Sequence, residues 1–176
     1  MEKSQLAKEI YIASHLTGEF KLRSGKTSNE YFDKYLFESN PKLLQEIAEH
    51  LSKLIPIGTE VLAGLEKGGI PIATALSLKT GIPVVFVRKK AKEYGTCKLA
   101  EGIDIKDKVV CIVEDVVTTG GQIKLSAEDL KEYGAKVKDV LCVIDRQQSG
   151  SENLSNEGLL LLLHSLLTMT ELKQSV

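Results

Sequence analysis

Two adjacent carboxylates, Glu114 and Asp115, follow the apolar run 109–113 and precede two valines, a Thr-Thr-Gly-Gly turn at 118–121 and a helical pattern that begins at Gln122. Such a turn leaves successive backbone N–H groups unpaired, and the following helix N-terminus adds partial positive charge, so the loop is suited to a phosphate. Acids beside a phosphate would repel the ligand unless they met sugar hydroxyls or hydrated Mg²⁺. These residues predict a site for a phosphorylated sugar. The alternative is an ordinary turn with solvated acids and a threonine cap.

A second cluster is cationic: Arg88, Lys89, Lys90 and Lys92 follow an apolar run that ends at Val87. Cations so close together would repel one another on a packed element, so they predict an exposed loop. Beside a phosphate site, they would neutralise a pyrophosphate leaving group. A solvated charged loop without a chemical role is the alternative.

Two further segments carry side chains suited to a planar ligand. Arg146 follows the apolar run 137–144, and arginine binds a carboxylate through two parallel hydrogen bonds; a surface pair with Asp145 is the alternative. Residues 20–33 include Tyr31 and Phe32, and taken alone they predict a hairpin turned at 24–26 with both rings packed inward.

The elements that position these residues are predicted by hydrophobic periodicity. Strands are expected at 60–65, 83–87, 108–113 and 137–144, and helices at 3–15, 41–54, 70–79 and 122–133. Continuous apolar strands separated by helices predict a doubly wound α/β fold with a mostly parallel sheet. Its ligand crevice should lie outside the carboxyl ends of the strands, where the unusual loops fall.

The bulk composition excludes several classes of protein. The 176 residues predict one domain, and 43% hydrophobic with 27% charged residues is ordinary for a globular protein. A net charge of -1 argues against bulk nucleic-acid binding, and the apolar runs are too short to span a membrane. No secretory signal is visible, so we expect a cytoplasmic location with Cys97, Cys111 and Cys142 reduced.

Residues 109–122 resemble the phosphoribosyl pyrophosphate (PRPP) signature of the type I phosphoribosyltransferases. The resemblance implies that Glu114 and Asp115 hold the ribose hydroxyls. It also implies that the 5′-phosphate is wrapped by Val116, Val117, Thr118, Thr119, Gly120, Gly121 and Gln122. A Walker-type loop is excluded because Phe20 stands where the first glycine before Gly25-Lys26-Thr27 is needed.

The cationic segment resembles the catalytic loop of orotate phosphoribosyltransferases, with Arg88, Lys89 and Lys92 matching and Tyr94 where many members carry histidine. In that family the loop acts in the neighbouring subunit, so the resemblance implies a homodimer that shares its sites through residues 88–102. Lys92 is then the main catalytic residue, with Arg88, Lys89 and Asp115 assisting, and residues 98–102 form a return strand.

Three segments resemble orotate enzymes in particular: 20–33 matches the N-terminal orotate motif, 145–147 the strand-end motif, and 64–71 the pyrophosphate loop. Glu66 and Lys67 would then supply backbone amides to pyrophosphate. The implied orotate contacts are Arg23, Tyr31, Phe32, Thr118 and Arg146. The resemblance continues to a closing helix start at 165–168.

The resemblance therefore implies transfer of a phosphoribosyl group from PRPP to orotate in pyrimidine biosynthesis. Mg²⁺ would be held mainly through PRPP, with water linking it to Asp115, and the protein would have no direct metal ligand. The single domain would comprise a hood at 1–40 and 150–176 and a core at 41–149. The alternatives are a transferase for another base and a non-catalytic PRPP sensor. Association with orotidine 5′-monophosphate decarboxylase is a further expectation.

Overall fold

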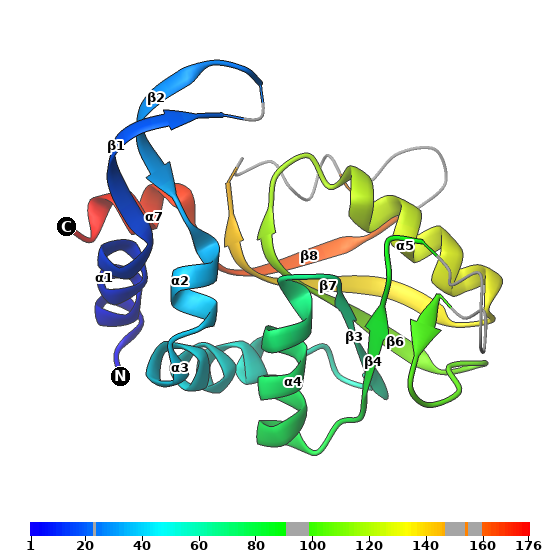
Figure 1. Cartoon of the computed structure of the whole chain (residues 1–176). Helices are drawn as coiled ribbons and strands as arrows, with labels where there is room; N and C mark the ends of the chain where they lie inside the picture. The colour runs from blue at the N-terminus through cyan, green and yellow to red at the C-terminus, as the bar shows by residue number, and fades with distance from the viewer. Residues whose placement is uncertain (23, 91–98, 147–153, 155–159) are drawn as a thin grey trace.

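A six-stranded sheet forms the centre of the chain. The computed structural model describes residues 1–22, 24–90, 99–146, 154 and 160–176. The sheet contains β3 (Val61–Leu65), β4 (Val84–Val87), β5 (Ala100–Glu101), β6 (Val109–Val117), β7 (Lys136–Asp145) and β8 (Leu162–Thr168) in the order β5-β4-β3-β6-β7-β8. All neighbouring pairs are parallel except β4 with β5 (Figure 1). The predicted α/β class with a mostly parallel sheet is confirmed.

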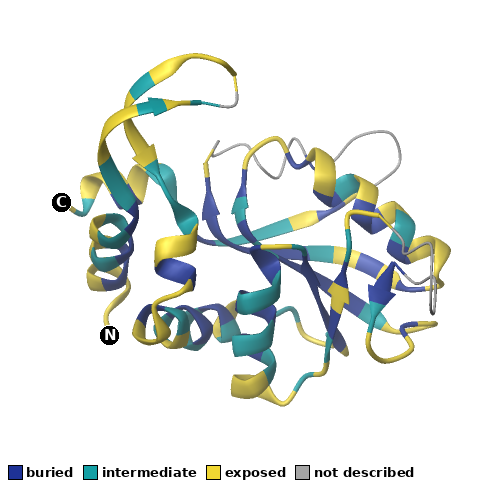
Figure 2. Cartoon of the chain, viewed as in Figure 1, coloured by how far each residue is buried: buried dark blue, intermediate teal, exposed yellow. Residues whose placement is uncertain are grey.

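Helices cover both faces of this sheet. α3 (Pro41–Leu51), which continues into a 3-10 turn (Ser52–Leu54), and α4 (Gly69–Thr80) pack on one face, and α5 (Gly121–Glu132) packs on the other. Alternate strand residues face opposite sides, so Leu62 joins the α3 and α4 side of the core while Ala63 joins the α5 side. The central strands are accordingly buried along most of their length (Figure 2).

The helix boundaries follow from local chemistry. The Asn40 side chain accepts hydrogen bonds from the Lys42 and Leu43 amides at the start of α3, and Pro41 occupies the first turn. Gly81 ends α4 with φ 76°, and its N–H donates to the Ser77 carbonyl. The four predicted helices are therefore present, each close to its expected ends.

The N-terminal segment and the last helix lie together beside the sheet. α1 (Lys3–Ser14) leads into an antiparallel hairpin of β1 (His15–Lys21) and β2 (Thr27–Phe32), then into α2 (Lys34–Glu38). The hairpin rises from the body of the molecule and is exposed over much of its length (Figures 1 and 2). α7 (Met169–Gln174) packs against α1, and the Lys3 amine lies 3.1 Å from the Glu171 carboxylate.

Two predictions about strands and helix starts were wrong. β6 extends to Val117 instead of ending at Val113, because both acids find partners while the strand keeps its register with β7. Residues 165–168 do not start a helix: they belong to β8, and α7 begins at Met169 with Thr168 as its cap. Pairing of β8 with β7 outweighs the weak strand preference of its leucines. The division into hood and core stays a prediction, and β8, assigned to the hood, lies in the core sheet.

The strand order creates a switch point between β3 and β6. The chain moves from β3 through α4 to β4 in one direction and from β6 through α5 to β7 in the other. The turns at the carboxyl ends of β3 and β6 therefore meet at the crevice where doubly wound folds bind ligands.

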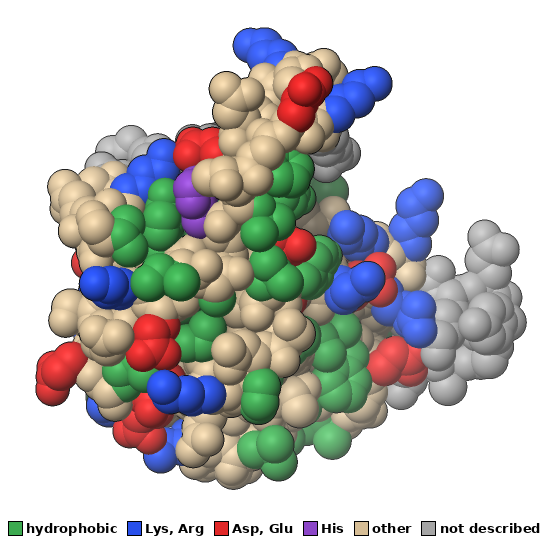
Figure 3. Space-filling model, turned by 60° about the vertical axis from the view of Figure 1, so that its left-hand side comes forward, with side chains coloured by type: hydrophobic (Ala, Val, Ile, Leu, Met, Phe, Trp, Pro, Cys, Tyr) green, Lys and Arg blue, Asp and Glu red, His purple; other side chains and the backbone are tan. Residues whose placement is uncertain are grey.

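Two observations concern the membrane and nucleic-acid-binding classes considered above. No helix in the described part of the chain is long and apolar enough to cross a bilayer. On the face that Figure 3 draws, Lys and Arg side chains are interspersed with Asp and Glu.

Candidate active site

The turn between β6 and α5 forms a phosphate-sized cradle. A cavity of about 260 Å³ is lined by Glu114, Val116, Val117, Thr118, Thr119, Gly120, Gly121, Gln122 and Ile123. Gly120 has φ 71°, and α5 begins without a side-chain cap, so its first amides stay available to a ligand. The sequence-predicted phosphate residues are thus brought together around an electropositive helix end.

Position 120 requires glycine for two reasons: its positive φ and the lack of space for a side chain. A Cβ added there would lie 2.4 Å from the Leu154 Cδ2 atom. Since real Cβ atoms do not approach so closely, a larger residue would displace either the cradle or Leu154. The turn is therefore packed from behind by the described Leu154.

The two adjacent acids have different environments. Glu114 lines the cradle, whereas the Asp115 side chain is only 1% exposed and turns toward α2. Asp115 forms an ion pair with Lys34, and its Oδ1 accepts a hydrogen bond from the Val116 amide at 2.5 Å. The Asp115 amide in turn donates to Glu114 Oε2 at 3.1 Å. The acids are therefore linked to each other and to the cradle.

A third carboxyl group, from Glu38 in α2, completes this cluster. Burial and a hydrogen bond with Asp115 raise the pKa of Glu38 to about 9. Burial and the neighbouring Asp115 charge raise the pKa of Glu114 to about 8. Burial opposes the ionisation of Asp115, but hydrogen bonds from Glu38 and Lys34 outweigh it and lower its pKa. The surroundings therefore favour the ionised form of Asp115 and the protonated forms of Glu38 and Glu114.

The turn after β3 packs against β6 beside Asp115. The peptide bond between Glu66 and Lys67 is cis, and the Lys67 amine lies 5.6 Å from the centre of the Tyr35 ring. A Cβ on Gly68 would lie 1.6 Å from Asp115 Oδ2, and one on Gly69 would lie 2.2 Å from the Val113 carbonyl oxygen. Both glycines therefore permit the turn to pack directly against β6.

The base of the cationic loop is fixed beside this turn. The Lys89 amide donates to Glu66 Oε1 at 2.9 Å, and the Arg88 side chain lies 3.6 Å from the Glu101 carboxylate. β5 pairs antiparallel with β4, as expected for the return strand. The predicted Lys92 and Tyr94 lie outside the described residues.

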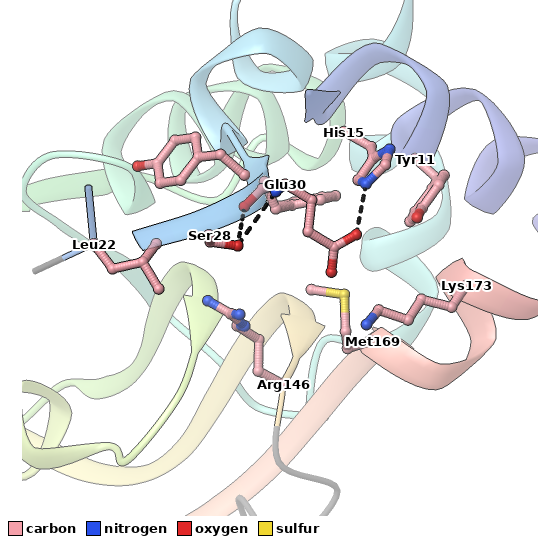
Figure 4. Close-up of a pocket in the computed structure, with 10 residues that line it drawn as sticks. Tyr11, His15, Leu22, Ser28, Glu30, Arg146, Met169 and Lys173 are labelled. Carbon is pink, nitrogen blue, oxygen red and sulfur yellow. Dashed lines mark hydrogen bonds and ion pairs between the residues drawn. The ribbon is translucent and has the colours of Figure 1, made fainter. Parts of the chain in front are cut away.

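A second cavity, of about 190 Å³, lies between the hairpin and the end of β7 (Figure 4). Its lining residues are Tyr11, His15, Leu22, Ser28, Glu30, Tyr31, Phe32, Arg146, Met169 and Lys173. The Arg146 guanidinium points toward the hairpin, and the Arg146 amide donates to the Val117 carbonyl at 3.0 Å. The cavity thus adjoins the strand that carries the cradle.

The predicted base-contacting residues are divided between the two cavities. Tyr31, Phe32 and Arg146 line the second cavity, Thr118 lines the cradle, and Arg23 lies outside the described residues. The inward packing expected from the hairpin reading alone holds for Phe32, which contacts the core, but Tyr31 is 44% exposed.

Several lining residues were missed by sequence reasoning. Glu30 lies 2.9 Å from the His15 ring nitrogen, and this hydrogen bond, helped by the Lys173 charge, lowers the Glu30 pKa. Lys173 reaches the cavity from α7 (Figure 4). Lys173 is far from Glu30 in sequence, and Lys34 and Glu38 are far from Asp115, so no local motif indicated that these residues would meet. A helical reading of 34–38 was the one signal that could have placed Lys34 and Glu38 on one face.

A phosphate cradle at a helix start, next to an acid pair and at the switch point of a parallel sheet, is the arrangement expected of a phosphoribosyltransferase. The phosphoribosyl transferase domain model matches residues 36–157, and the chain belongs to that family.

Within the family, the chain belongs to the orotate phosphoribosyltransferases, the pentosyltransferases of pyrimidine biosynthesis. The orotate phosphoribosyltransferase of Nocardioides sp. is 52% identical over 88% of this chain and 86% of its own length. That of Mycobacterium tuberculosis is 29% identical, with a TM-score of 0.86 over 97% of this chain and 98% of that chain. A structure of the same enzyme in complex with PRPP is 26% identical over the same shares, with a TM-score of 0.81.

Proposed function

We propose that the chain binds PRPP across the β3 and β6 turns and transfers its phosphoribosyl group to orotate held beside Arg146. The bond from C1′ to the pyrophosphate oxygen breaks with its electron pair staying on pyrophosphate. A ring nitrogen of orotate bonds to C1′ and gives up its proton to the departing pyrophosphate or to water. The observation that carries this proposal is that α5 begins without a side-chain cap beside Glu114. Arg146, which follows the neighbouring strand β7, lines the second cavity. The amides of α5 take the 5′-phosphate in this arrangement, and Glu114 faces the ribose from the cradle. The near-complete burial of Asp115 does not favour the direct ribose contact expected for it, so Asp115 serves the site by holding its neighbours Glu114 and Val116.

Catalysis in this arrangement is electrostatic. As the C1′ bond breaks, positive charge develops on the ribose and negative charge on pyrophosphate, and fixed charges stabilise both without a protein nucleophile. Arg88 and Lys89 begin the loop beside the turn at Glu66 and Lys67, where pyrophosphate would lie. We propose Lys92, further along that loop, as the main catalytic cation.

We propose that Mg²⁺ is bound chiefly by the substrate. The described residues contain no group of three or more His, Cys, Asp or Glu side chains that could hold a metal. Mg²⁺ commonly keeps several waters and binds through phosphates with few protein ligands, so this donor set fits a metal carried by PRPP. The near-complete burial of Asp115 does not favour the water contact expected for it. Bound Mg²⁺ would neutralise charge on the departing pyrophosphate.

Arg146 supports orotate as the base. Orotate carries a carboxylate, which a guanidinium can hold through two parallel hydrogen bonds. Tyr31 and Phe32 offer apolar surface on the facing wall of the same cavity. Adenine, xanthine and uracil lack the carboxylate and would leave Arg146 without its partner.

We also propose a homodimer in which the loop of residues 88–102, anchored at Lys89 beside the β3 turn of its own subunit, acts in the neighbouring site. The resemblance of the segment that begins at Arg88 and Lys89 to the family's catalytic loop supports this. The cytoplasmic location and the association with a decarboxylase stay predictions, which cell fractionation and co-purification would test.

The activity is tested by incubating the protein with PRPP and Mg²⁺ while following the loss of orotate absorbance. Parallel reactions contain adenine, xanthine or uracil instead. We expect consumption of orotate alone, loss of activity on chelation with EDTA, and recovery on adding Mg²⁺. Consumption of another base would move the substrate assignment, and PRPP binding without consumption of any base would support the sensor alternative.

A further inference from the structure

We propose that Lys34 and Glu38 of α2 are positioning residues for PRPP, because they fix the carboxylate of Asp115 and, through it, the acid pair beside the cradle. The inference rests on the proposed function and adds two residues from a helix that carries none of the recognised motifs. Neither residue lines the cradle or the base cavity. Their effect would reach the substrate through Asp115.

The contacts around Asp115 account for both of its oxygens. Oδ1 accepts from the Val116 amide, and Oδ2 forms the ion pair with Lys34. Oδ2 also lies against Gly68, close to Glu38 Oε1, so α2 and the β3 turn meet at this carboxylate. A side chain only 1% exposed and held from three directions has little freedom to reorient.

The hydrogen bonding of Glu38 and Asp115 requires one proton shared between the two carboxyl groups. If Glu38 and Asp115 were both ionised, Glu38 Oε1 would have no hydrogen-bond partner and Asp115 Oδ2 only the Lys34 ion pair. Two buried carboxylates in contact repel one another, so one of them holds a proton. With the proton on Glu38, its hydroxyl donates to Asp115, and the buried oxygens are satisfied.

Fixing Asp115 also fixes the residues that line the cradle. Asp115 accepts from the Val116 amide and donates its own amide to Glu114, and both of these neighbours line the phosphate cavity. α2 contacts the β3 turn as well, since the amines of both Lys34 and Lys67 lie over the Tyr35 ring. The helix therefore connects the two turns between which PRPP would lie.

The test compares Glu38→Ala, Glu38→Gln and Lys34→Met by steady-state kinetics with PRPP and orotate varied separately. Loss of a hydrogen bond to an ionised group predicts a rise of about tenfold in KM for PRPP in Glu38→Ala and Lys34→Met, with KM for orotate nearly unchanged. Glu38→Gln should recover most of the loss, because its amide donates the same hydrogen bond without a titratable proton.

Lys42→Ala serves as the control. It removes an exposed lysine that lies 3.5 Å from Glu9, far from the cradle, and should behave as wild type. Melting temperatures with and without PRPP show which variants are folded. Folded Glu38→Ala and Lys34→Met proteins with a normal KM for PRPP would overturn the inference, as would a Glu38→Gln protein as impaired as Glu38→Ala. An inactive wild type would instead contradict the proposed function.

Discussion

Arg146 lines the second cavity, and the proposed function assigns it to recognition of the orotate carboxylate. Arg146→Lys keeps the charge but loses the planar pair of donors, and Arg146→Ala loses both. We expect KM for orotate to rise roughly 10-fold to 100-fold in Arg146→Ala and less in Arg146→Lys, while KM for PRPP changes little. Initial rates at varied orotate measure the effect. An unchanged KM for orotate in Arg146→Ala would remove this residue from base recognition.

Glu38 links the stability of the fold to pH. Its pKa is about 9 in the folded protein, against an ordinary value of 4.5. A carboxyl whose pKa is raised by folding contributes its full stability below the ordinary value and loses it as pH rises through the folded value. Unfolding free energy should therefore fall between about pH 4.5 and 9.

Glu38→Gln should flatten this decline by up to about 1.4 kcal/mol per pH unit, because one proton is no longer released. Urea unfolding at several pH values measures the slope. Glu114 contributes a decline of the same sign toward its own pKa of about 8, so some slope should remain in the variant. Parallel curves for the variant and wild type would show that Glu38 is ionised in the folded protein.

At the scale of elements, the junction of β6 and α5 depends on Gly120. Gly120→Ala introduces a left-handed non-glycine residue, at about 1–2 kcal/mol, together with a contact to Leu154 that requires movement. Gly58→Ala is a matched control, because Gly58 has φ 87° but open space around its added Cβ. Both variants should lose stability by thermal unfolding, and only Gly120→Ala should raise KM for PRPP. A normal KM in Gly120→Ala would show that the turn does not hold the phosphate.

The sequence predicted elements whose signals are local. The four central strands were predictable because their apolar runs are continuous, and the cradle because its residues are adjacent in the chain. α2 and β8 were not predicted: α2 has five residues, and β8 is a leucine-rich strand ordered by pairing with β7. The boundary of β6 was missed because acids usually end a strand, whereas here Lys34 and Glu38 stabilise Asp115 within it.

At the scale of the whole molecule, the site combines segments that the sequence keeps apart. Arg146 and Lys173 line one cavity only because β7 and α7 end beside the same hairpin. Lys34 reaches Asp115 only because the fold brings α2 close to the acid pair of β6. A motif can identify the contiguous part of such a site, but long-range contacts become visible only when the sheet order is known.

The shared site proposed for the dimer gives a test that a monomeric enzyme would fail. Lys92→Ala should reduce turnover by about 10²–10³ while substrate binding persists, since one transition-state donor is lost. Glu114→Ala should be inactive because its own cradle is damaged. When the two variants are mixed as subunits, a heterodimer pairs an intact cradle from the first with an intact loop from the second.

Random exchange of equal amounts makes about half of the dimers mixed, with one functional site of two, so activity should recover to about a quarter of wild type. Unfolding and refolding the variants together, then separately as controls, provides the comparison. A loop that serves its own subunit leaves every mixed dimer with one defect in each site, and the mixture would then be no more active than its components.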